Sequence, residues 1–530
     1  MKNSFFLVIP AQSNSPERLS PYGKDAVNQW ILELPTANPS LSTRLLFDFI
    51  EDLNKVDMPA QQRLDVLELI RPSFLLIEDY LRSRLLVAGF PKGENEQKIF
   101  NVLILIERSF AVGYWVIIRE ITRRDTGWFK ARNVPLAIQR TIKGLSEIVV
   151  THYMMFRAVP DWIWIDLHSL YKLSVRAKKE TTKVPDITRL PSKVSTSEEC
   201  YKQVLLLSLA EPSGLMQKEI AQVYRFIGNI CQYISIEKQA VKDQKGQCIV
   251  LMDEDTKPFW QKDGGQPDSS MMYMDLLRLY KALQGSNKYI DNEDARFSSL
   301  IKQNKASEKM SASLFMYLQR CWMGETFSGG DFFGDRLDRY ISIGLDATHL
   351  LQSDSKTRGG EEALEFLAES FSDRELACTF EQEGVLSIGS LVSFRKTNEP
   401  ESKRVLSVVK KITIPAQSEK IVFELAAISP VSYAVSYVNL DADVKDMDDS
   451  HHKALLYGVK DKSGEKSFII VESFMHKNDD GLRLFMGGKN FPIILGNRKN
   501  IGLGYWQFEC RQIEEKQVEQ ISKKKGYDFI

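Results

Sequence analysis

Two arginines stand immediately before a run of alternating apolar and polar residues. In the stretch DRLDRYISIGL, residues 335–345, Arg336 and Arg339 precede the alternation YISIGL. A guanidinium is planar and donates two parallel hydrogen bonds, so it binds phosphates and guanine edges in a bidentate manner. One interpretation is a ligand-binding pair at the mouth of a β-barrel. The other is an ordinary charged entry to a domain, in which Asp335 and Asp338 pair with the arginines locally.

An acidic loop, LDADVKDMDDSHH at 440–452, offers the types of side chain that ligate divalent ions. The candidate ligands are Asp446, Asp448, Asp449, His451 and His452. The EF-hand spacing fails because the sixth residue from the first aspartate is not glycine and no glutamate closes the loop. The pattern therefore favours a solvated acidic linker over a metal site.

Local enzyme motifs are lacking. MGGKN at 486–490 does not have the phosphate-loop spacing, and the sequence contains no G-x-G-x-x-G, G-x-S-x-G or H-E-x-x-H. His168 in WIDLHSLY is predicted to lie in helix packing, and the pair Asp253 and Asp255 in a surface turn. We expect a non-enzymatic protein, and an enzyme class without a local motif is the remaining alternative.

Composition narrows the class of protein further. The chain has 530 residues, of which 43% are apolar and 26% charged, and this length predicts about three or four domains. Lys plus Arg equals Asp plus Glu at 70 each, which argues against nucleic acid as a partner. The six cysteines form no CxxC pair, which predicts reduced thiols and a cytoplasmic location. The apolar run 102–106 is broken by charges, so no membrane insertion is expected.

A stack of amphipathic helices is predicted to precede the arginines. Residues 1–40 read as an N-terminal arm, and from 41 to 240 the apolar residues recur at helical spacing, as in Leu41, Leu45 and Phe49. Pro72 either kinks one long helix or opens the next one at its first turn. Helical hairpins in series bury their faces on one another, so we expect a solenoid-like helical domain.

The apolar period changes from about four to two after Arg339. Residues 241–330 read as a mixed helical region and linker, and 331–440 as a small β-barrel interrupted by a helix at 361–371. A second small β region with a C-terminal tail is predicted over 453–530. The fold class expected is therefore α+β and multidomain, with α-helices first and β-structure second.

The whole chain resembles bacterial PilZ-domain proteins that have a long helical N-terminal region. The resemblance runs in consistent order over nearly the whole sequence. The stretches that carry it are LSTRLLFDFIEDLNKVDMPAQQRLDVLELIRPSFLLIEDYLRSRL, DLHSLYKLSVRAKK, CYKQVLLLSLAEPSGLMQKEIAQVYRFI, LQRCWMGETFSGGDFFGDRLDRYISIGLDATHLL, IGSLVSFRK with RVLSVVKKI, and KNIGLGYWQFECRQI.

The resemblance implies a PilZ-like β-barrel and cyclic di-GMP as its ligand, with no other cofactor. The family carries Arg-x-x-x-Arg before the first strand and Asp/Asn-x-Ser-x-x-Gly on the barrel. Here Arg336 and Arg339 are one residue closer, and the second motif is absent before the strand SLVSF. Arg336 and Arg339 are the ligand-binding residues expected, with Arg395 and Lys396 as further candidates for the phosphates.

Two functions follow from these expectations. The first is a non-enzymatic cytoplasmic effector or scaffold that binds cyclic di-GMP and relays it to a protein partner through the helical region. The second is a protein-interaction scaffold whose degenerate barrel binds no nucleotide. The partner, the pathway and the oligomeric state are not specified by the sequence.

Overall fold

The computed structural model divides the chain into two compact units, which are described separately. The first unit comprises Met1–Ala88, Lys92–Ser286 and Tyr317–Thr326, and the second comprises Gly89–Pro91, Asn287–Met316 and Phe327–Ile530. The structure describes residues 5–13, 16–123, 133–190, 192–242, 244, 246–261, 270–284, 290–291, 310–325, 330–353, 364–416, 418–440, 451–461, 464–473 and 475–515.

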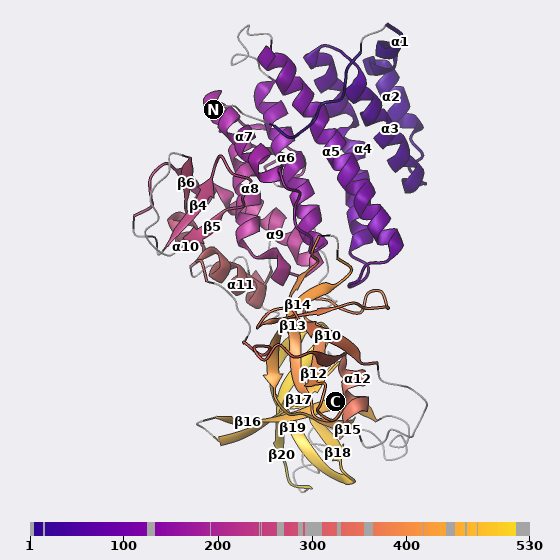
Figure 1. The fold of residues 1–530 in the computed structure, drawn as a ribbon, viewed down its shortest axis with the longest axis vertical. Helices are drawn as coiled ribbons and strands as arrows, with labels where there is room; N and C mark the ends of the chain where they lie inside the picture. The colour runs from indigo at the N-terminus through magenta and orange to yellow at the C-terminus, as the bar shows by residue number, and fades with distance from the viewer. Residues whose placement is uncertain are drawn as a thin grey trace, which may run out of the picture. The chain divides into compact units, whose positions relative to one another are not determined.

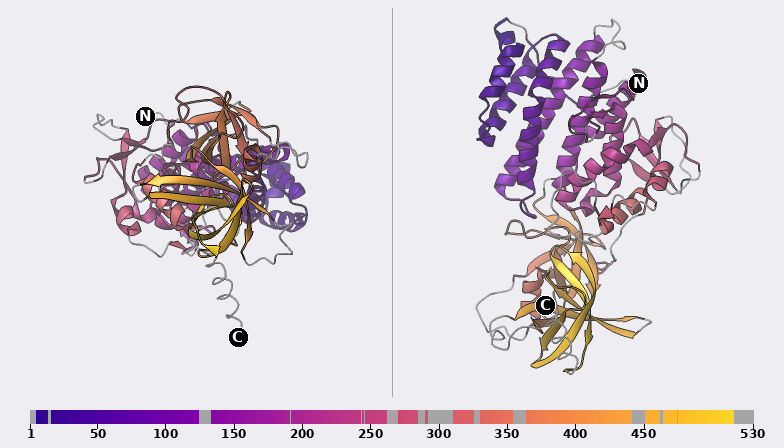
Figure 2. Two further views of the ribbon diagram at one scale, coloured as in Figure 1. Left: turned by 90° about the horizontal axis from the view of Figure 1, so that it is seen from below. Right: turned by 180° about the vertical axis from the view of Figure 1, so that it is seen from behind.

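The first unit consists mainly of long helices that lie side by side (Figures 1 and 2). Neighbours along the chain pack on one another, α4 on α5, α5 on α6, and α8 on α9, as predicted for helical hairpins in series. The helices are α1 (Pro16–Leu19), η1 (Ser20–Tyr22), α2 (Lys24–Glu33), α3 (Pro39–Lys55), α4 (Ala60–Leu85), α5 (Glu94–Arg123), α6 (Val134–Met154), α7 (Ile163–Arg176), α8 (Ser197–Leu209), η3 (Pro212–Gly214), α9 (Gln217–Ile230) and η4 (Cys231–Tyr233).

Local sequence signals explain where several helices begin. The Asn38 side chain accepts a hydrogen bond from the backbone N–H of Leu41 at the start of α3. At α8, Thr196 and Glu199 form a reciprocal capping box. Pro72 lies inside α4, which continues through it, so the alternative in which Pro72 opens a new helix is wrong.

A small sheet follows the helices, with strand order β3-β6-β4-β5. Its strands are antiparallel neighbours. The elements of this region are β3 (Ser235–Glu237), β4 (Gln247–Leu251), β5 (Phe259–Gln261), β6 (Met271–Asp275), α10 (Leu277–Leu283), β7 (Ile290–Asp291), β8 (Met310–Ser311) and α11 (Ala312–Trp322), and two short strands precede α8, β1 (Val184–Pro185) and β2 (Val194–Ser195).

A six-stranded antiparallel barrel begins at Arg339, as the change of period predicted. The helix predicted at 361–371 is wrong, because residues 366–370 form a strand paired on both sides. The barrel closes in the order β10-β11-β14-β13-β12-β9. Its elements are β9 (Arg339–Ile343), α12 (Leu345–Gln352), β10 (Phe366–Ser370), β11 (Glu375–Cys378), β12 (Leu391–Lys396), β13 (Val405–Thr413) and β14 (Ile421–Ser429).

A second six-stranded barrel follows, closed in the order β15-β16-β17-β20-β19-β18. Its first strand lies within 331–440, the range predicted for the first barrel, and residues 441–450 of the predicted acidic loop lie outside the described residues. The strands are β15 (Tyr433–Asn439), β16 (His452–Asp461), β17 (Gly464–Val471), β18 (Gly481–Met486), β19 (Lys489–Gly502) and β20 (Tyr505–Gln512).

The two barrels have the same topology. In each, the strands taken in chain order are arranged around the barrel as first, second, third, sixth, fifth and fourth. They also bury a common apolar cluster, so they pack as neighbours within the second unit. That cluster consists of Leu345, Leu391, Leu406, Val408, Leu455, Tyr457, Ile470, Ile501 and Tyr505.

The α+β multidomain class expected from the sequence is therefore confirmed. The structure refines it, because the β region consists of two closed barrels.

Candidate functional site

A group of cations lies where β9 and β12 pair in the first barrel. The antiparallel register places Lys396 opposite Arg339 and Arg395 opposite Tyr340. The sequence proposed these three cations from different stretches, and the strand ladder brings them together. We call Arg339, Arg395, Lys396 and the nearby Arg336 the basic site.

The Arg339 side chain is buried, and both of its Nη atoms are hydrogen-bonded. Its Nη2 donates to both carboxylate oxygens of Asp335, at 2.7 and 2.8 Å, and its Nη1 donates to the Leu337 carbonyl at 2.6 Å. The Lys396 Nζ contacts the same carboxylate at 3.0 Å. One carboxylate therefore binds two neighbouring cations.

The environment of Asp335 changes its acidity. Desolvation opposes the charged form, but the hydrogen bonds from Arg339 and Lys396 outweigh it and lower the pKa of Asp335 to about 2. Asp335 also accepts a hydrogen bond from the backbone N–H of Leu337, which orients the carboxylate toward the strand. Asp335 is therefore ionised at neutral pH and accepts both of its hydrogen bonds from Arg339 through the Nη2 atom.

A second carboxylate, Glu365, holds Arg395. The Nε and Nη2 atoms of Arg395 donate to the two oxygens of Glu365 at 2.9 and 2.6 Å, which is a bidentate pair. The Arg395 guanidinium also lies over the Tyr340 ring, 4.5 Å from its centroid. Glu365 pairs with Arg404 as well, a side chain with no exposed surface. Burial opposes ionisation of Glu365, but these hydrogen bonds lower its pKa.

Arg336 points to a different part of the barrel rim. Its Nη2 lies 3.0 Å from Asp373, and its Nη1 donates to the Phe371 carbonyl at 3.3 Å. The backbone of Arg336 has a φ of 56°, a left-handed conformation that is uncommon for a residue with a side chain. This turn separates the two arginines, so Arg336 and Arg339 do not share a carboxylate.

The chemistry available at the basic site is anion recognition. Guanidinium forks bind phosphates in the same bidentate geometry in which Arg395 now binds Glu365. An anionic ligand would have to replace these carboxylates or bind beside them. The sequence suggested Asp335 as an internal partner, but it gave no signal for Glu365, which lies 30 residues before Arg395 in the chain.

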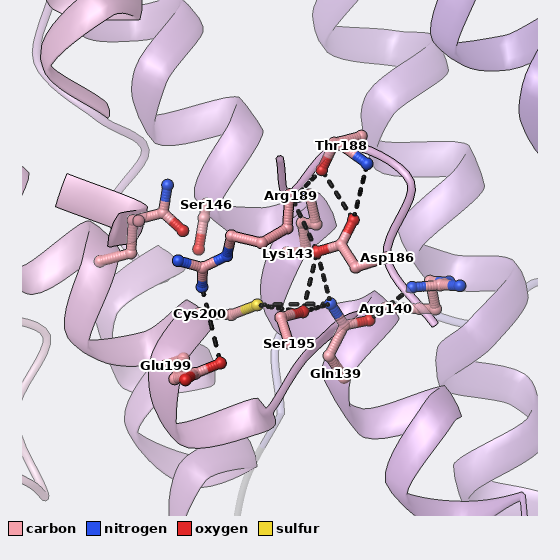
Figure 3. Close-up of polar contacts among 12 residues, drawn as sticks. Gln139, Arg140, Lys143, Ser146, Asp186, Thr188, Arg189, Ser195, Glu199 and Cys200 are labelled. Carbon is pink, nitrogen blue, oxygen red and sulfur yellow. Dashed lines mark hydrogen bonds and ion pairs between the residues drawn. The ribbon is translucent and has the colours of Figure 1, made fainter. Parts of the chain in front are cut away.

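A buried polar cluster in the helical unit was not found from the sequence (Figure 3). Asp186 has no exposed surface and accepts hydrogen bonds from Ser195 at 2.8 Å and from the Thr188 hydroxyl at 2.7 Å. Lys143 of α6 lies 3.2 Å from the same carboxylate. Desolvation opposes the charge, but these contacts lower the pKa of Asp186. The cluster fastens the β1–β2 segment onto α6, which is a structural role.

A second buried cluster gathers three carboxylates around one arginine. Arg82 lies 2.7 Å from Glu107, 2.6 Å from Glu147 and 3.2 Å from Glu78. Desolvation raises the pKa of Glu107 to about 7, against the opposing effect of Arg82. These residues come from α4, α5 and α6, so they join three consecutive helices of the unit.

The other candidates from the sequence have structural partners. His168 is buried as predicted, between the Tyr201 hydroxyl at 2.6 Å and the Thr256 carbonyl at 3.0 Å. Asp255 accepts hydrogen bonds from two backbone N–H groups at the start of α7. Asp253 pairs with Lys172 at 2.6 Å.

Among the residues that the structure describes, no group of His, Cys, Asp or Glu has an arrangement that could hold a metal ion. Asp446, Asp448 and Asp449 of the predicted acidic loop lie outside that part of the chain.

A cavity of about 210 Å³ lies on the first barrel. It is lined by residues of β10, β11 and β14 and of the turn before β14, including Phe371, Pro415 and Val422, and an ion pair between Glu369 and Lys420 stands at its rim. It contains none of the four cations of the basic site.

One helix in the described part of the chain, Glu94–Thr122, is long and apolar enough to cross a membrane. The most apolar 18-residue stretch of this helix is 67% buried within the fold, where the helix packs against α4 and α6. Such burial is typical of a core helix.

The comparisons with known proteins concern the helical unit. Residues 25–241 match the family described as "Cyclic-di-GMP receptor FimW, N-terminal domain". The protein Cyclic-di-GMP receptor FimW of Pseudomonas aeruginosa is 26% identical over 212 residues, which is 40% of this chain and 35% of that protein. No solved structure matches the chain. The resemblance to cyclic di-GMP receptors is thus confirmed for the helical half, and the match spans about a third of the relative's length.

Proposed function

We propose that this chain is a non-enzymatic cytoplasmic receptor that binds cyclic di-GMP and passes the signal to a protein partner. The observation that carries the proposal is the match of residues 25–241 to the N-terminal domain of a cyclic di-GMP receptor family. The helical unit, which offers extended helix faces, is the part that would contact the partner.

The basic site of the first barrel is the ligand site in this proposal. Arg395 and Lys396 would contact the phosphates, and Arg336 and Arg339 the phosphates and guanines. The guanidinium forks of the three arginines have the donor geometry that such a ligand needs, and Lys396 adds a positive charge. The ligand would compete with Asp335 and Glu365, which are bound to the same cations.

Isothermal titration of the full-length protein with cyclic di-GMP tests the proposal. Binding should be lost in the double variant Arg395→Ala/Lys396→Ala and weakened in Arg336→Ala. Asp335→Asn should bind more tightly, because the internal competitor of Arg339 is removed. The control is Arg374→Ala, an exposed arginine that pairs with Asp331. No heat with the parent protein, or equal binding by all variants, would refute the assigned site.

A protein-interaction scaffold without a nucleotide ligand is the second candidate. It is favoured by one observation, that every cation of the basic site already has a carboxylate partner. In that case the cations stabilise the barrel, titration gives no heat, and the full-length chain captures its partner equally well with and without cyclic di-GMP.

A further inference from the structure

Helix α12 makes polar contacts with both barrels. It packs against β9 and β12 of the first barrel and against β15 and β16 of the second. Toward the second barrel, His349 donates through Nε2 to the Val435 carbonyl at 3.0 Å, and Gln352 donates to the Ser432 hydroxyl at 3.0 Å. These contacts tie α12 to the start of β15.

On its other side, α12 meets a buried arginine. The Thr348 hydroxyl lies within hydrogen-bond distance of the Ser393 hydroxyl, at 3.0 Å, and also bonds the Gly344 carbonyl at 2.8 Å. Arg404 donates to that same hydroxyl through Nε at 2.8 Å and to the Ser393 carbonyl through Nη2 at 3.1 Å. The Arg404 side chain has no exposed surface. Its buried charge is therefore stabilised by these hydrogen-bond partners and by the carboxylate of Glu365.

Glu365 links this buried arginine to the basic site. One carboxylate binds both Arg404 and Arg395. The contacts therefore form a continuous series from Arg395 through Glu365, Arg404 and Ser393 to Thr348 on α12.

Loss of the ion pair between Arg395 and Glu365 would also affect Arg404, because Glu365 is the counterion of both arginines. A ligand phosphate that takes Arg395 from Glu365 alters the position or the hydrogen bonding of that carboxylate. A buried guanidinium tolerates the loss of its carboxylate poorly, so Arg404 must readjust its other contacts. Ser393 is the contact between Arg404 and α12, and α12 is the element that both barrels hold.

We propose that α12 couples the basic site of the first barrel to the second barrel through the series Glu365, Arg404, Ser393 and Thr348. The natural trigger of this coupling would be cyclic di-GMP bound at the basic site, so in this respect the coupling rests on the proposed function. Two arrangements of α12, with Glu365 bound to Arg395 and with Glu365 released, would differ in how tightly the start of β15 is held.

The test uses amide hydrogen exchange of the full-length protein and needs no ligand. Glu365→Gln removes the charge that balances Arg404 while keeping the side-chain size. We expect exchange to become about tenfold faster in α12 and in β15, with little change over residues 489–495, the part of β19 that has no residue in the apolar cluster around Leu345 of α12. Unchanged exchange in α12 and β15 would overturn the proposal. So would a uniform increase over both barrels, because that would show general destabilisation.

The matched variant Thr348→Val removes the hydroxyl that joins α12 to Ser393. In this background, Glu365→Gln should still affect the first barrel but should leave β15 at the rate of Thr348→Val alone. Thr413→Val, an exposed threonine on β13, is the control and should leave the response intact. If Glu365→Gln does not fold, Ser393→Ala is used instead. We then expect a smaller increase in the exchange rates of α12 and β15. The absence of any increase would count against the coupling.

A parallel titration with cyclic di-GMP separates the two proposals. If no heat is released but Glu365→Gln loosens α12 and β15, the ligand assignment fails and the coupling stands. If cyclic di-GMP binds and the exchange of β15 does not change, the receptor function stands and the coupling fails.

Discussion

Lys396 lies opposite Arg339 in the β9–β12 ladder, and both cations bind the carboxylate of Asp335. Like charges in directly opposed positions of an antiparallel pair destabilise it. Here the shared carboxylate neutralises that repulsion, and the buried guanidinium of Arg339 receives its counterion. Asp335 therefore has a structural role whether or not a ligand binds.

Asp335→Asn should lower the free energy of unfolding of the C-terminal unit by about 1.5–3 kcal/mol at neutral pH, the range for hydrogen bonds to charged groups. Because the pKa of Asp335 is lowered to about 2, its stabilisation is present above the unfolded value near 4 and is lost as the pH falls toward 2. Urea unfolding at several pH values should show the parent and the variant converging across that window.

Asp331→Asn is the control for this prediction, since Asp331 pairs with Arg374 at the surface. Solvent screens an exposed pair of this kind, so Asp331→Asn should lose much less stability than Asp335→Asn. Equal losses in the two variants would mean that the contacts of Asp335 with Arg339 and Lys396 carry no special stabilisation.

Glu107→Gln should stabilise the helical unit in neutral and alkaline solution by roughly 1–2 kcal/mol. Desolvation raises the pKa of Glu107 to about 7, so the folded protein keeps a proton that the unfolded chain releases. The free energy of unfolding of the parent therefore falls as the pH rises from about 4 to 7. The variant lacks this titration, and its advantage should grow across the same window in urea melts.

Glu94→Gln, at an exposed ion pair with Lys98 on the same helix, is the comparison. An advantage of Glu107→Gln that does not change with pH would contradict a raised pKa as its origin.

Much of the fold could be predicted because it depends on local periodicity. The alternating runs at 391–395 and 405–409 are strands, and the four-residue stripes before 240 are helices. The prediction was wrong at residues 366–370, because the stretch EEALEFLAESF at 361–371, which contains them, has high helix propensity. Pairing with β9 and β11 on both sides outweighs that propensity and makes them a strand.

The candidate site could be predicted only in part, for a related reason. Arg339 and Asp335 are four residues apart, so the sequence alone suggested their pairing. The contacts of Glu365 with Arg395 and Arg404 depend on how three separate segments meet in the closed barrel. No pattern in one sequence marks such long-range partners, and the common topology of the two barrels is likewise a property of strand pairing.

Asp186→Ala should destabilise the helical unit by about 3–5 kcal/mol, the cost of breaking a buried charge pair. The substitution leaves Lys143 and Ser195 without their carboxylate partner in a closed interior. Because these contacts lower the pKa of Asp186, the stabilisation should be lost only in strong acid, as the pH falls below the range of an exposed aspartate. Thermal and urea unfolding measure both effects.

The control for Asp186 is Asp48→Ala, which removes an exposed carboxylate beside Arg44. It should change stability by less than about 0.5 kcal/mol. A similarly small effect of Asp186→Ala would show that the polar cluster of Figure 3 contributes little to the helical unit.

Gly502→Ala should disturb the packing of one barrel on the other. A Cβ at Gly502, in β19, would lie 2.3 Å from the Gly389 carbonyl oxygen of the first barrel and 3.1 Å from Val408. The same carbonyl accepts a hydrogen bond from the Leu503 N–H at 2.7 Å, so it cannot retreat without losing that bond. Overpacking of this kind costs about 1–3 kcal/mol.

Gly496→Ala on the same strand is the matched control, because its Cβ would meet its nearest atom, a backbone oxygen, at 3.8 Å. That substitution should be neutral or stabilising by up to about 1 kcal/mol, since alanine restricts the unfolded chain more than glycine does. Urea unfolding compares the two variants, and hydrogen exchange at Leu503 reports the contact directly. Equal stability of the two variants, with Leu503 still protected, would mean that the barrels accommodate the methyl group and that their contact at Gly389 is not close in solution.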